Sequence, residues 1–401
     1  GQMQKLQVLR VYNCKGIKEV FETQSGTSSN KNKSGCDEGI PRVNNNVIML
    51  PNLKILKIEW CWRLEHIFTF SALENLRQLQ ELSIMFCYGM KVIVKNEEED
   101  ALFNLPSKEV VVFPRLKSIK LGFLPELEGF FLGMNEFRLP SLNNVIIKEC
   151  PKMMVFAAGW STAPQLKYIH TGLGKHSLGE CGLNFHQTPF QSLYGDTSGP
   201  ATSEGTTWSF HNLIELDYFN KDVKKIIPSS ELLQLQKLEK IYVNSCYWVE
   251  EVFETALEAA GRNTNSSSGS GFDESSQTTT TTLVNLPNLT QVKLEYLPGL
   301  RYVWKSNQWT VFQFPNLTNV YISHCNSLEN VFTSSMVGSL LQLQELTIRY
   351  CWNMEELIVK DADVSVEEDK EKESGGKTNK EIIVLPCLKS LILFNLPCLK
   401  G

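Results

Sequence analysis

A short pattern of apolar residues recurs along this chain of 401 residues and constrains its fold more than any other feature. Residues 51–68 show the pattern most clearly. Leu53 is followed by apolar residues three, five and eight positions later, at Leu56, Ile58 and Cys61. Leu56 and Ile58 alternate, so they point to one face of a short strand. A single unit of this kind cannot bury its apolar face alone, and we expect it to stack on copies of itself.

Twelve copies of the pattern, here called rungs, run the length of the chain, and each begins at an anchor leucine. Leu, Ile or Val follows every anchor three residues later, and only Thr171 breaks the apolar run five residues later. Eight residues after the anchor, seven rungs carry cysteine. The anchors are Leu6, Leu53, Leu79, Leu116, Leu142, Leu166, Leu213, Leu238, Leu289, Leu317, Leu343 and Leu388.

This spacing is that of a leucine-rich repeat. The sequence therefore predicts an α/β solenoid, an arc with a parallel β-sheet on its concave face and short helices or turns on its convex side. Helical stretches are expected at 72–79, 230–238 and 335–343. We interpret the recurrent cysteines as small buried thiols that donate weakly to the backbone. Disulfides or a metal site are the alternatives, but no C-x-x-C spacing is present.

The spacing between anchors predicts one domain with inserts. Short steps run 24 to 28 residues and long steps run 37 to 51 residues. The extra residues are mostly polar or charged and lack the apolar content needed to pack, so we expect disordered loops. They lie near 22–46, 95–110, 172–207, 261–282 and 360–381. Residues 1–401 are thus expected to form a single repeat domain of about twelve rungs. Both ends fall inside a repeat, so we interpret the chain as a fragment of a longer protein.

Several functional classes find little support in the composition. A net charge of −5 argues against general nucleic-acid affinity, and no apolar run is long enough to span a membrane. The histidines show no paired spacing of metal ligands. We expect His170, His176 and His186 to lie in a solvated loop; a metal or catalytic site is the alternative. No convergent polar site is evident, so we expect no enzyme and assign no catalytic, metal or cofactor-binding residue.

The remaining candidate for function is a surface. The position before the cysteine, or before the leucine that replaces it, is often aromatic, and other outward strand positions add further rings. Stacked rungs would gather these rings into a broken strip on the concave face, and exposed aromatic residues are typical of protein-binding surfaces. The alternative is that the rings tilt over the strand edge and only cover the core. The predicted strip consists of Tyr12, Trp60, Phe86, Phe123, Tyr242, Tyr296, Tyr321, Tyr350 and Phe394.

The rungs also carry a family resemblance. Residues 50–58 (LPNLKILKI) and 113–119 (FPRLKSI) resemble the repeat domain of plant intracellular immune receptors of the coiled-coil, nucleotide-binding, leucine-rich-repeat class. The inserts rich in Ser and Thr, and the run GFFLGMNEF at 129–137, resemble the downy-mildew resistance-candidate family of lettuce. The resemblance covers essentially the whole chain.

This resemblance implies a cytoplasmic receptor segment that takes part in defence against pathogens. Its implied partners are proteins: a pathogen effector, a guarded host protein, or the receptor's own nucleotide-binding domain. Family members bind ADP or ATP in that domain, and no residue here matches it, so no cofactor is expected in this segment.

Two other classes of repeat protein share parts of this pattern. An extracellular receptor or inhibitor would show a regular 24-residue period with L-x-G-x-I-P elements, and neither is present. A substrate adaptor of a ubiquitin ligase also uses repeats with cysteine and is the alternative function. It would usually carry I-T-D after the cysteine, where this chain has Trp62-Arg63-Leu64.

Overall fold

The twelve predicted rungs divide equally between two compact units, Gly1–Ser209 and Phe210–Gly401, in the computed structural model of the chain. We refer to them as the first unit and the second unit. The structure describes residues 3–18, 20, 50–96, 110–178, 182–184, 210–255, 282–305, 310–360 and 384–400. The predicted inserts therefore lie largely outside the described residues, apart from their edges and parts of 172–207.

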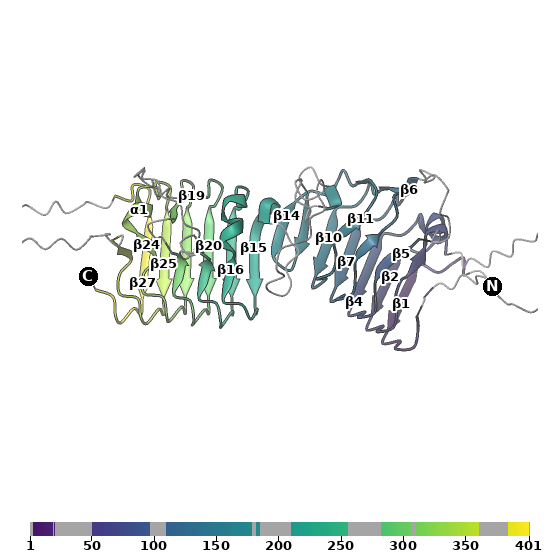
Figure 1. The fold of residues 1–401 in the computed structure, drawn as a ribbon, viewed down its shortest axis with the longest axis horizontal. Coiled ribbons are helices and arrows are strands. Elements are labelled where there is room, and N and C mark those ends of the chain that lie inside the picture. The colour runs from purple at the N-terminus through teal and green to yellow at the C-terminus, as the bar shows by residue number, and fades with distance from the viewer. Residues whose placement is uncertain are drawn as a thin grey trace, which may run out of the picture. The chain divides into compact units, whose positions relative to one another are not determined.

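In the first unit, six parallel strands lie side by side in chain order (Figure 1). Each strand starts two residues after its anchor leucine, as the pattern predicts. Neighbouring strands pair in register, so that Leu56 lies opposite Leu82, and Leu82 opposite Ile119. The strands are β1 (Val8–Tyr12), β2 (Ile55–Glu59), β4 (Glu81–Met85), β7 (Ser118–Gly122), β10 (Asn144–Lys148) and β13 (Tyr168–Thr171).

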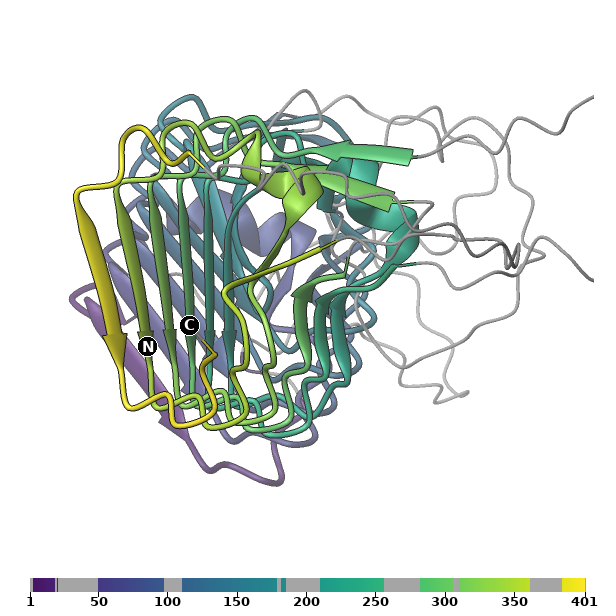
Figure 2. The same ribbon diagram turned by 90° about the vertical axis from the view of Figure 1, so that its left-hand side faces the viewer.

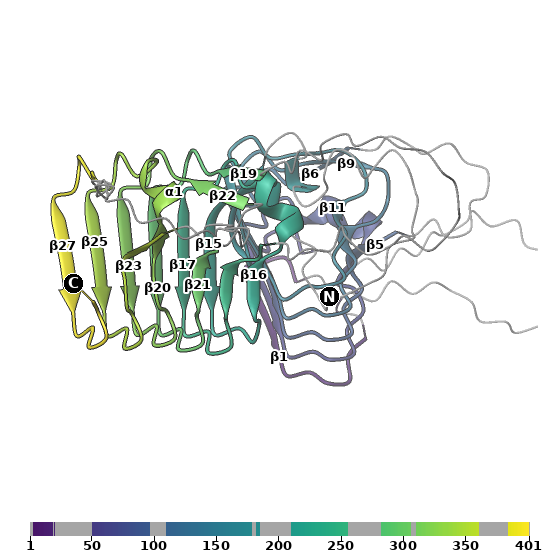
Figure 3. The same ribbon diagram turned by 60° about the vertical axis from the view of Figure 1, so that its left-hand side comes forward.

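The second unit repeats this arrangement with six further parallel strands (Figure 3). Val292 lies opposite Ile241 on one side and Val320 on the other, so rung positions again form straight columns across the sheet. The strands are β15 (Leu213–Phe219), β17 (Lys240–Asn244), β20 (Gln291–Glu295), β23 (Asn319–Ser323), β25 (Glu345–Arg349) and β27 (Ser390–Phe394).

The wall opposite each long sheet consists mainly of short parallel strands, where we expected helices or turns. Successive rungs stack in register here too, so their backbone N–H and C=O groups pair across rungs. In the first unit, β3 (Phe68–Thr69), β5 (Val92–Lys95), β8 (Gly129–Phe131) and β11 (Val155–Ala157) form one sheet, and β6 (Val110–Val112), β9 (Glu136–Arg138) and β12 (Ser161–Thr162) form another.

The second unit has the same kind of wall, seen along the stack in Figure 2. Three small sheets make it up: β16 (Lys225–Ile227), β18 (Glu251–Phe253) and β21 (Tyr302–Trp304); β19 (Thr282–Asn285) and β22 (Thr310–Gln313); and β24 (Phe332–Thr333) and β26 (Ile358–Val359).

Helices form near the three predicted places but are shorter than expected. The stretch expected at 72–79 is the 3-10 helix η1 (Phe70–Leu76), and that expected at 230–238 is the 3-10 helix η4 (Ser229–Gln234). The stretch expected at 335–343 is the single α-helical turn α1 (Ser334–Val337). Two further 3-10 turns are η2 (Gly182–Asn184) and η3 (Phe210–Asn212).

The core of each unit lies between its two walls and is built from the repeating apolar positions. Ten of the twelve anchor leucines are buried, and the two in the end rungs, Leu6 and Leu388, are half-buried. The three phenylalanines of the GFFLGMNEF run are core as well: Phe130, Phe131 and Phe137 are buried and in ring contact. Its Gly133 is required, because a Cβ there would lie 2.3 Å from the ring of Phe131.

The last rung of the first unit ends differently from the others. β14 (Gly174–Ser177) turns back and pairs antiparallel with β13, inside the stretch 172–207 that we expected to be disordered. Thr171, the one exception to the apolar pattern, makes the turn: its Oγ1 accepts from the backbone N–H of Leu173 (3.1 Å) and pairs with Nε2 of His176 (2.9 Å). His176 is fully buried, so its expected solvated position is wrong.

A second ordered part of that stretch covers the free edge of the small sheet β3–β5–β8–β11. The side-chain amide of Asn184 imitates a strand there. Its Oδ1 accepts from the backbone N–H groups of Phe156 (2.6 Å) and Ala157 (3.3 Å), and its Nδ2 donates to the carbonyl of Ala157 (2.8 Å). Unpaired strand edges are sites of unwanted pairing, and this amide closes one.

Candidate protein-binding surface

A left-handed bend follows the long strand in eleven of the twelve rungs. The residue seven positions after the anchor has a φ between 51° and 61° in each of them. Asn tolerates this conformation, whereas bulky residues rarely adopt it. The eleven residues are Asn13, Trp60, Phe86, Phe123, Glu149, Asn220, Ser245, Tyr296, His324, Tyr350 and Asn395.

The cysteine after the bend stabilises it, as the sequence predicts. In all seven rungs with cysteine at this position, Sγ donates to the carbonyl oxygen two residues earlier, at 3.4 to 3.6 Å. Six of these thiols are buried, and Cys14 in the first rung is exposed. Burial raises the pKa of Cys87 and of Cys150 to about 12, so both remain protonated donors at neutral pH.

Three of the predicted aromatic residues form a stacked column at the bends of the first unit, which we call the first ladder. Trp60 and Phe86 lie with ring centroids 4.3 Å apart and an interplanar angle of 9°, and Phe86 and Phe123 follow at 4.5 Å and 11°. Phe123 is 40% exposed, while Trp60 and Phe86 are half-buried. The rings stack because the same rung position places them on adjacent rungs.

The second unit carries a matching column, the second ladder. Tyr296 stacks on His324 with centroids 4.5 Å apart, and His324 stacks on Tyr350 at 4.6 Å. Phe394 closes the column, with its ring edge-to-face against Tyr350 at 5.3 Å. His324 was not among the predicted residues; its place before Cys325, at the position of the other ladder residues, is the signal that identifies it.

The other predicted aromatic residues lie on strands and outside both ladders. Tyr12, the last residue of β1, is 66% exposed. Tyr242 and Tyr321 occupy the middle of β17 and β23, where the hydroxyl of Tyr242 donates to Oε1 of Gln291 (3.0 Å). The nine predicted residues therefore form two stacked columns and three separate strand positions.

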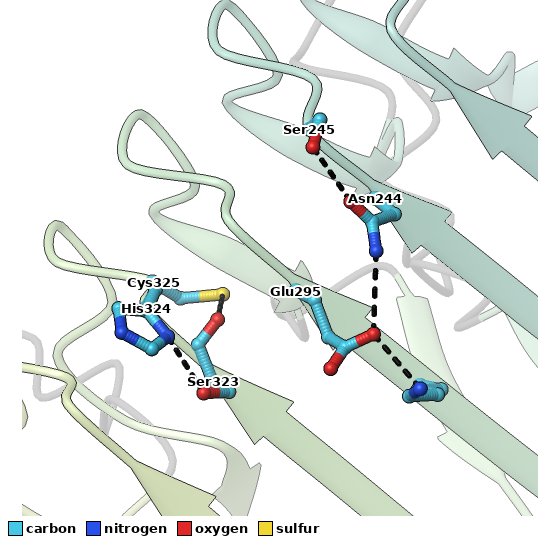
Figure 4. Close-up of polar contacts among 7 residues, drawn as sticks. Asn244, Ser245, Glu295, Ser323, His324 and Cys325 are labelled. Atoms are coloured by element: carbon cyan, nitrogen blue, oxygen red, sulfur yellow. Dashed lines mark hydrogen bonds and ion pairs between the residues drawn. The ribbon is translucent and has the colours of Figure 1, made fainter.

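A polar network borders the second ladder (Figure 4). Asn244 Nδ2 donates to Glu295 Oε2 (3.3 Å), and Lys293 Nζ lies 2.8 Å from the same oxygen. Ser323 Oγ pairs with Nδ1 of His324 (2.8 Å), which fixes the plane of the imidazole within the stack. The imidazole of His324 is therefore held in the second ladder by a hydrogen bond as well as by ring contacts.

Further exposed rings, not among the predicted residues, lie two positions beyond the residue at the bend. Trp62 and Tyr88 are 45% and 42% exposed, with ring centroids 6.1 Å apart. In the second unit, Tyr247 and Trp352 occupy the same rung position and are also exposed. The signal was available, since each of the four follows a recurrent cysteine directly.

No group of His, Cys, Asp or Glu suited to hold a metal ion occurs in the parts of the chain that the structure describes. None of the helices there is long and apolar enough to cross a membrane.

Comparison with known proteins identifies the family. No individual curated protein matches the chain significantly. The family of leucine-rich repeats described as plant disease resistance protein RPS2-like matches residues 38–169 and 201–352, well over half of the sequence. The matched segments contain ten of the twelve anchor leucines and all of both ladders except Phe394. The chain therefore belongs to the RPS2-like family of leucine-rich repeats of plant disease resistance proteins.

Proposed function

We propose that the chain is the recognition and regulatory repeat segment of an intracellular plant immune receptor. The parent receptor is of the coiled-coil, nucleotide-binding class and resembles the lettuce downy-mildew resistance candidates. Its place is the cytoplasm, and ADP or ATP binds in its nucleotide-binding domain. The segment binds a pathogen effector or a guarded host protein through the two ladders.

The observation that carries this proposal is the choice of bulky rings at a left-handed position. Such a backbone costs about 1–2 kcal/mol per residue that is neither Gly nor Asn. The two stacking contacts of the first ladder contribute about 1–3 kcal/mol in all, which does not exceed the strain of three residues. Strained residues concentrate where a protein meets its ligands.

Other rungs of the same chain show that the bend itself does not need a ring. Asn13, Asn220 and Asn395 adopt the same φ at the same position. The exposure of the rings supports a role beyond covering the core, since Phe123 and Tyr296 expose 40% and 48% of their surface. Exposed, preorganised aromatic residues are typical anchors of protein interfaces.

The experiment is a binding screen of the full chain against a library of pathogen effectors and leaf proteins, followed by a triple substitution, Trp60→Asn, Phe86→Asn and Phe123→Asn. Asn retains the bend, so we expect a folded protein that loses the captured partners. A second triple variant, Tyr296→Asn, His324→Asn and Tyr350→Asn, tests the second ladder. The control is the double variant Met134→Asn with Trp160→Asn. It removes two large apolar side chains that are 71% and 70% exposed and lie outside both ladders.

The design separates recognition from stability. Loss of partners in either ladder variant with retention in the control supports the proposal. If both ladder variants retain every partner and their circular dichroism is unchanged, the proposed function is wrong.

A further inference from the structure

Cationic side chains gather around the first ladder, although the chain as a whole is acidic. The strand face and its bends are formed by the positions one, two, four, six and seven residues after each anchor. In the described rungs of the first unit, these positions carry seven Lys or Arg and three Glu. The same positions of the second unit carry four Lys or Arg and five Asp or Glu. The surplus of positive charge is thus confined to one unit.

Most of these cations have no internal partner. Five of them lie beyond ion-pair distance of any carboxylate in the described part of the chain: Arg10, Lys117, Lys120, Lys148 and Lys167. Lys57 lies 3.7 Å from Glu81, a long ion pair, and Lys54 contacts only the neutral amide of Gln7 (3.2 Å).

The second unit gives the contrast. There two of the four cations lie within ion-pair distance of a carboxylate, Lys240 at 3.7 Å from Glu215 and Lys293 at 2.8 Å from Glu295, against one of seven in the first unit. Cations that a fold does not neutralise produce a positive potential over the surface that carries them. Counted over these positions, the surplus of cations lies in the first unit, which carries the first ladder.

The stacking of the first ladder decides what kind of group it can contact. Phe86 has one face covered by Trp60 and the other by Phe123, so its exposed part is the ring edge. The edge of an aromatic ring is the positive part of its quadrupole and favours carboxylate and carbonyl oxygen or apolar contact. Bases of single-stranded nucleic acid need open ring faces on which to stack, and the interior of this ladder offers none.

We infer that the first ladder and the cations beside it bind a polypeptide segment rich in both carboxylates and apolar side chains. This inference rests on the proposed function and names the chemistry of the partner. Carboxylates of the partner pair with Lys117, Lys120 and Lys148, and its apolar side chains lie against the ring edges. Because the chain as a whole carries a net charge of −5, a surface with a surplus of cations is the part of it that favours such a segment.

The test uses the full chain and a fluorescein-labelled peptide in which Asp and Glu alternate with Leu and Phe. Fluorescence anisotropy should rise on mixing and should fall again as salt screens the charges. Reversal of three cations, Lys117→Glu, Lys120→Glu and Lys148→Glu, should weaken binding about tenfold or more. The matched control, Lys95→Glu, Lys152→Glu and Lys360→Glu, changes the net charge equally outside this surface and should leave binding within about twofold.

Three further probes test other classes of ligand. These are the same peptide with Lys in place of Asp and Glu, an oligothymidylate, and vesicles of phosphatidylserine. Tighter binding of any of them than of the acidic peptide overturns the inference, as does equal binding by the reversed and control variants. Thermal melting checks that the reversed variant folds, and a Lys→Gln triple at the same positions repeats the test without added carboxylates.

Failure here is distinguishable from failure of the proposed function. If the Asn variant of the first ladder loses its captured partners while the charge-reversed variant keeps them, the ladder does bind the partner but the partner is not recognised through its carboxylates. If the acidic peptide binds through the three lysines but neither ladder variant loses a partner, the cationic surface binds acidic segments and the proposed recognition through the ladders is wrong.

Discussion

The ring of Phe86 lies nearly parallel to that of Trp60, 4.3 Å away, although both residues hold a left-handed backbone that bulky side chains rarely adopt. The strain and the stacking arise from the same cause. The bend after each strand fixes the direction of the side chain, and the register of neighbouring rungs places one ring over the next. A repeat protein can thus build a continuous aromatic surface by substitution at one rung position.

Phe86→Asn is expected to change the free energy of unfolding by less than about 1.5 kcal/mol. The lost stacking contacts and ring burial are offset by relief of the left-handed strain. Phe130→Ala in the core, by contrast, should cost about 3–5 kcal/mol because it leaves a cavity. Urea denaturation of the two variants measures both values. A loss at Phe86 as large as that at Phe130 would show that the ring serves mainly to cover the core.

Asn184→Ala is expected to destabilise the first unit by about 2–3 kcal/mol. The substitution leaves the backbone N–H groups of Phe156 and Ala157 and the carbonyl of Ala157 without their amide partner. Asn184→Asp is the matched variant, since it keeps the acceptor and loses only the donor to Ala157. Hydrogen exchange at residues 155–157 reports the change directly. Equal protection in all three proteins would contradict the assigned role.

The strand positions could be predicted from the sequence because their signal is periodic. Leu56 and Ile58 recur at the same offsets in neighbouring rungs, and a one-residue shift would expose every one of them. The buried thiols followed from the same offsets, since Cys61 and Cys87 hold identical places in their rungs. Periodicity therefore predicts both the sheet and the cysteine that stabilises seven of the bends.

Features without a period could not be predicted in this way. Asn184 lies in a polar stretch, and its role depends on the free edge of β11, which only the folded unit reveals. The wall of short strands escaped prediction because segments such as Val155–Ala157 are too short to show alternation. The ladders were predicted in part: alternation gave outward positions such as Tyr242, but the left-handed bend separates these from Phe86 and Phe123.

Alkaline pH is expected to destabilise the chain through its buried thiols. The pKa of Cys87 and of Cys150 is about 12 in the folded state, against about 8.5 for a free thiol. Between these values the unfolded state loses a proton that the folded state keeps. The free energy of unfolding is therefore not reduced by these thiols below a pH of about 8.5, and it declines as the pH rises from there towards 12.

The corresponding measurement is the free energy of unfolding of the reduced protein between neutral and alkaline pH. Each thiol should contribute a loss on the order of 1 kcal/mol per pH unit in the alkaline range. Cys87→Ser with Cys150→Ser should flatten the decline, because serine does not titrate there. An equal slope in the double variant would assign the decline to other groups.

Thr171→Val is expected to destabilise the chain even though it restores the apolar pattern of the other rungs. Valine has nearly the same shape as threonine but lacks the Oγ1 that accepts from the N–H groups of Leu173 and Gly174 and pairs with His176. These groups are buried, so losing their partner should cost about 1–3 kcal/mol. Thr171→Ser, which keeps the hydroxyl, is the matched variant and should retain the hairpin. Urea denaturation together with proton NMR of the His176 ring follows both effects. If valine proved as stable as threonine, the hairpin at the end of the first unit would owe its form to chain connectivity and not to this hydroxyl.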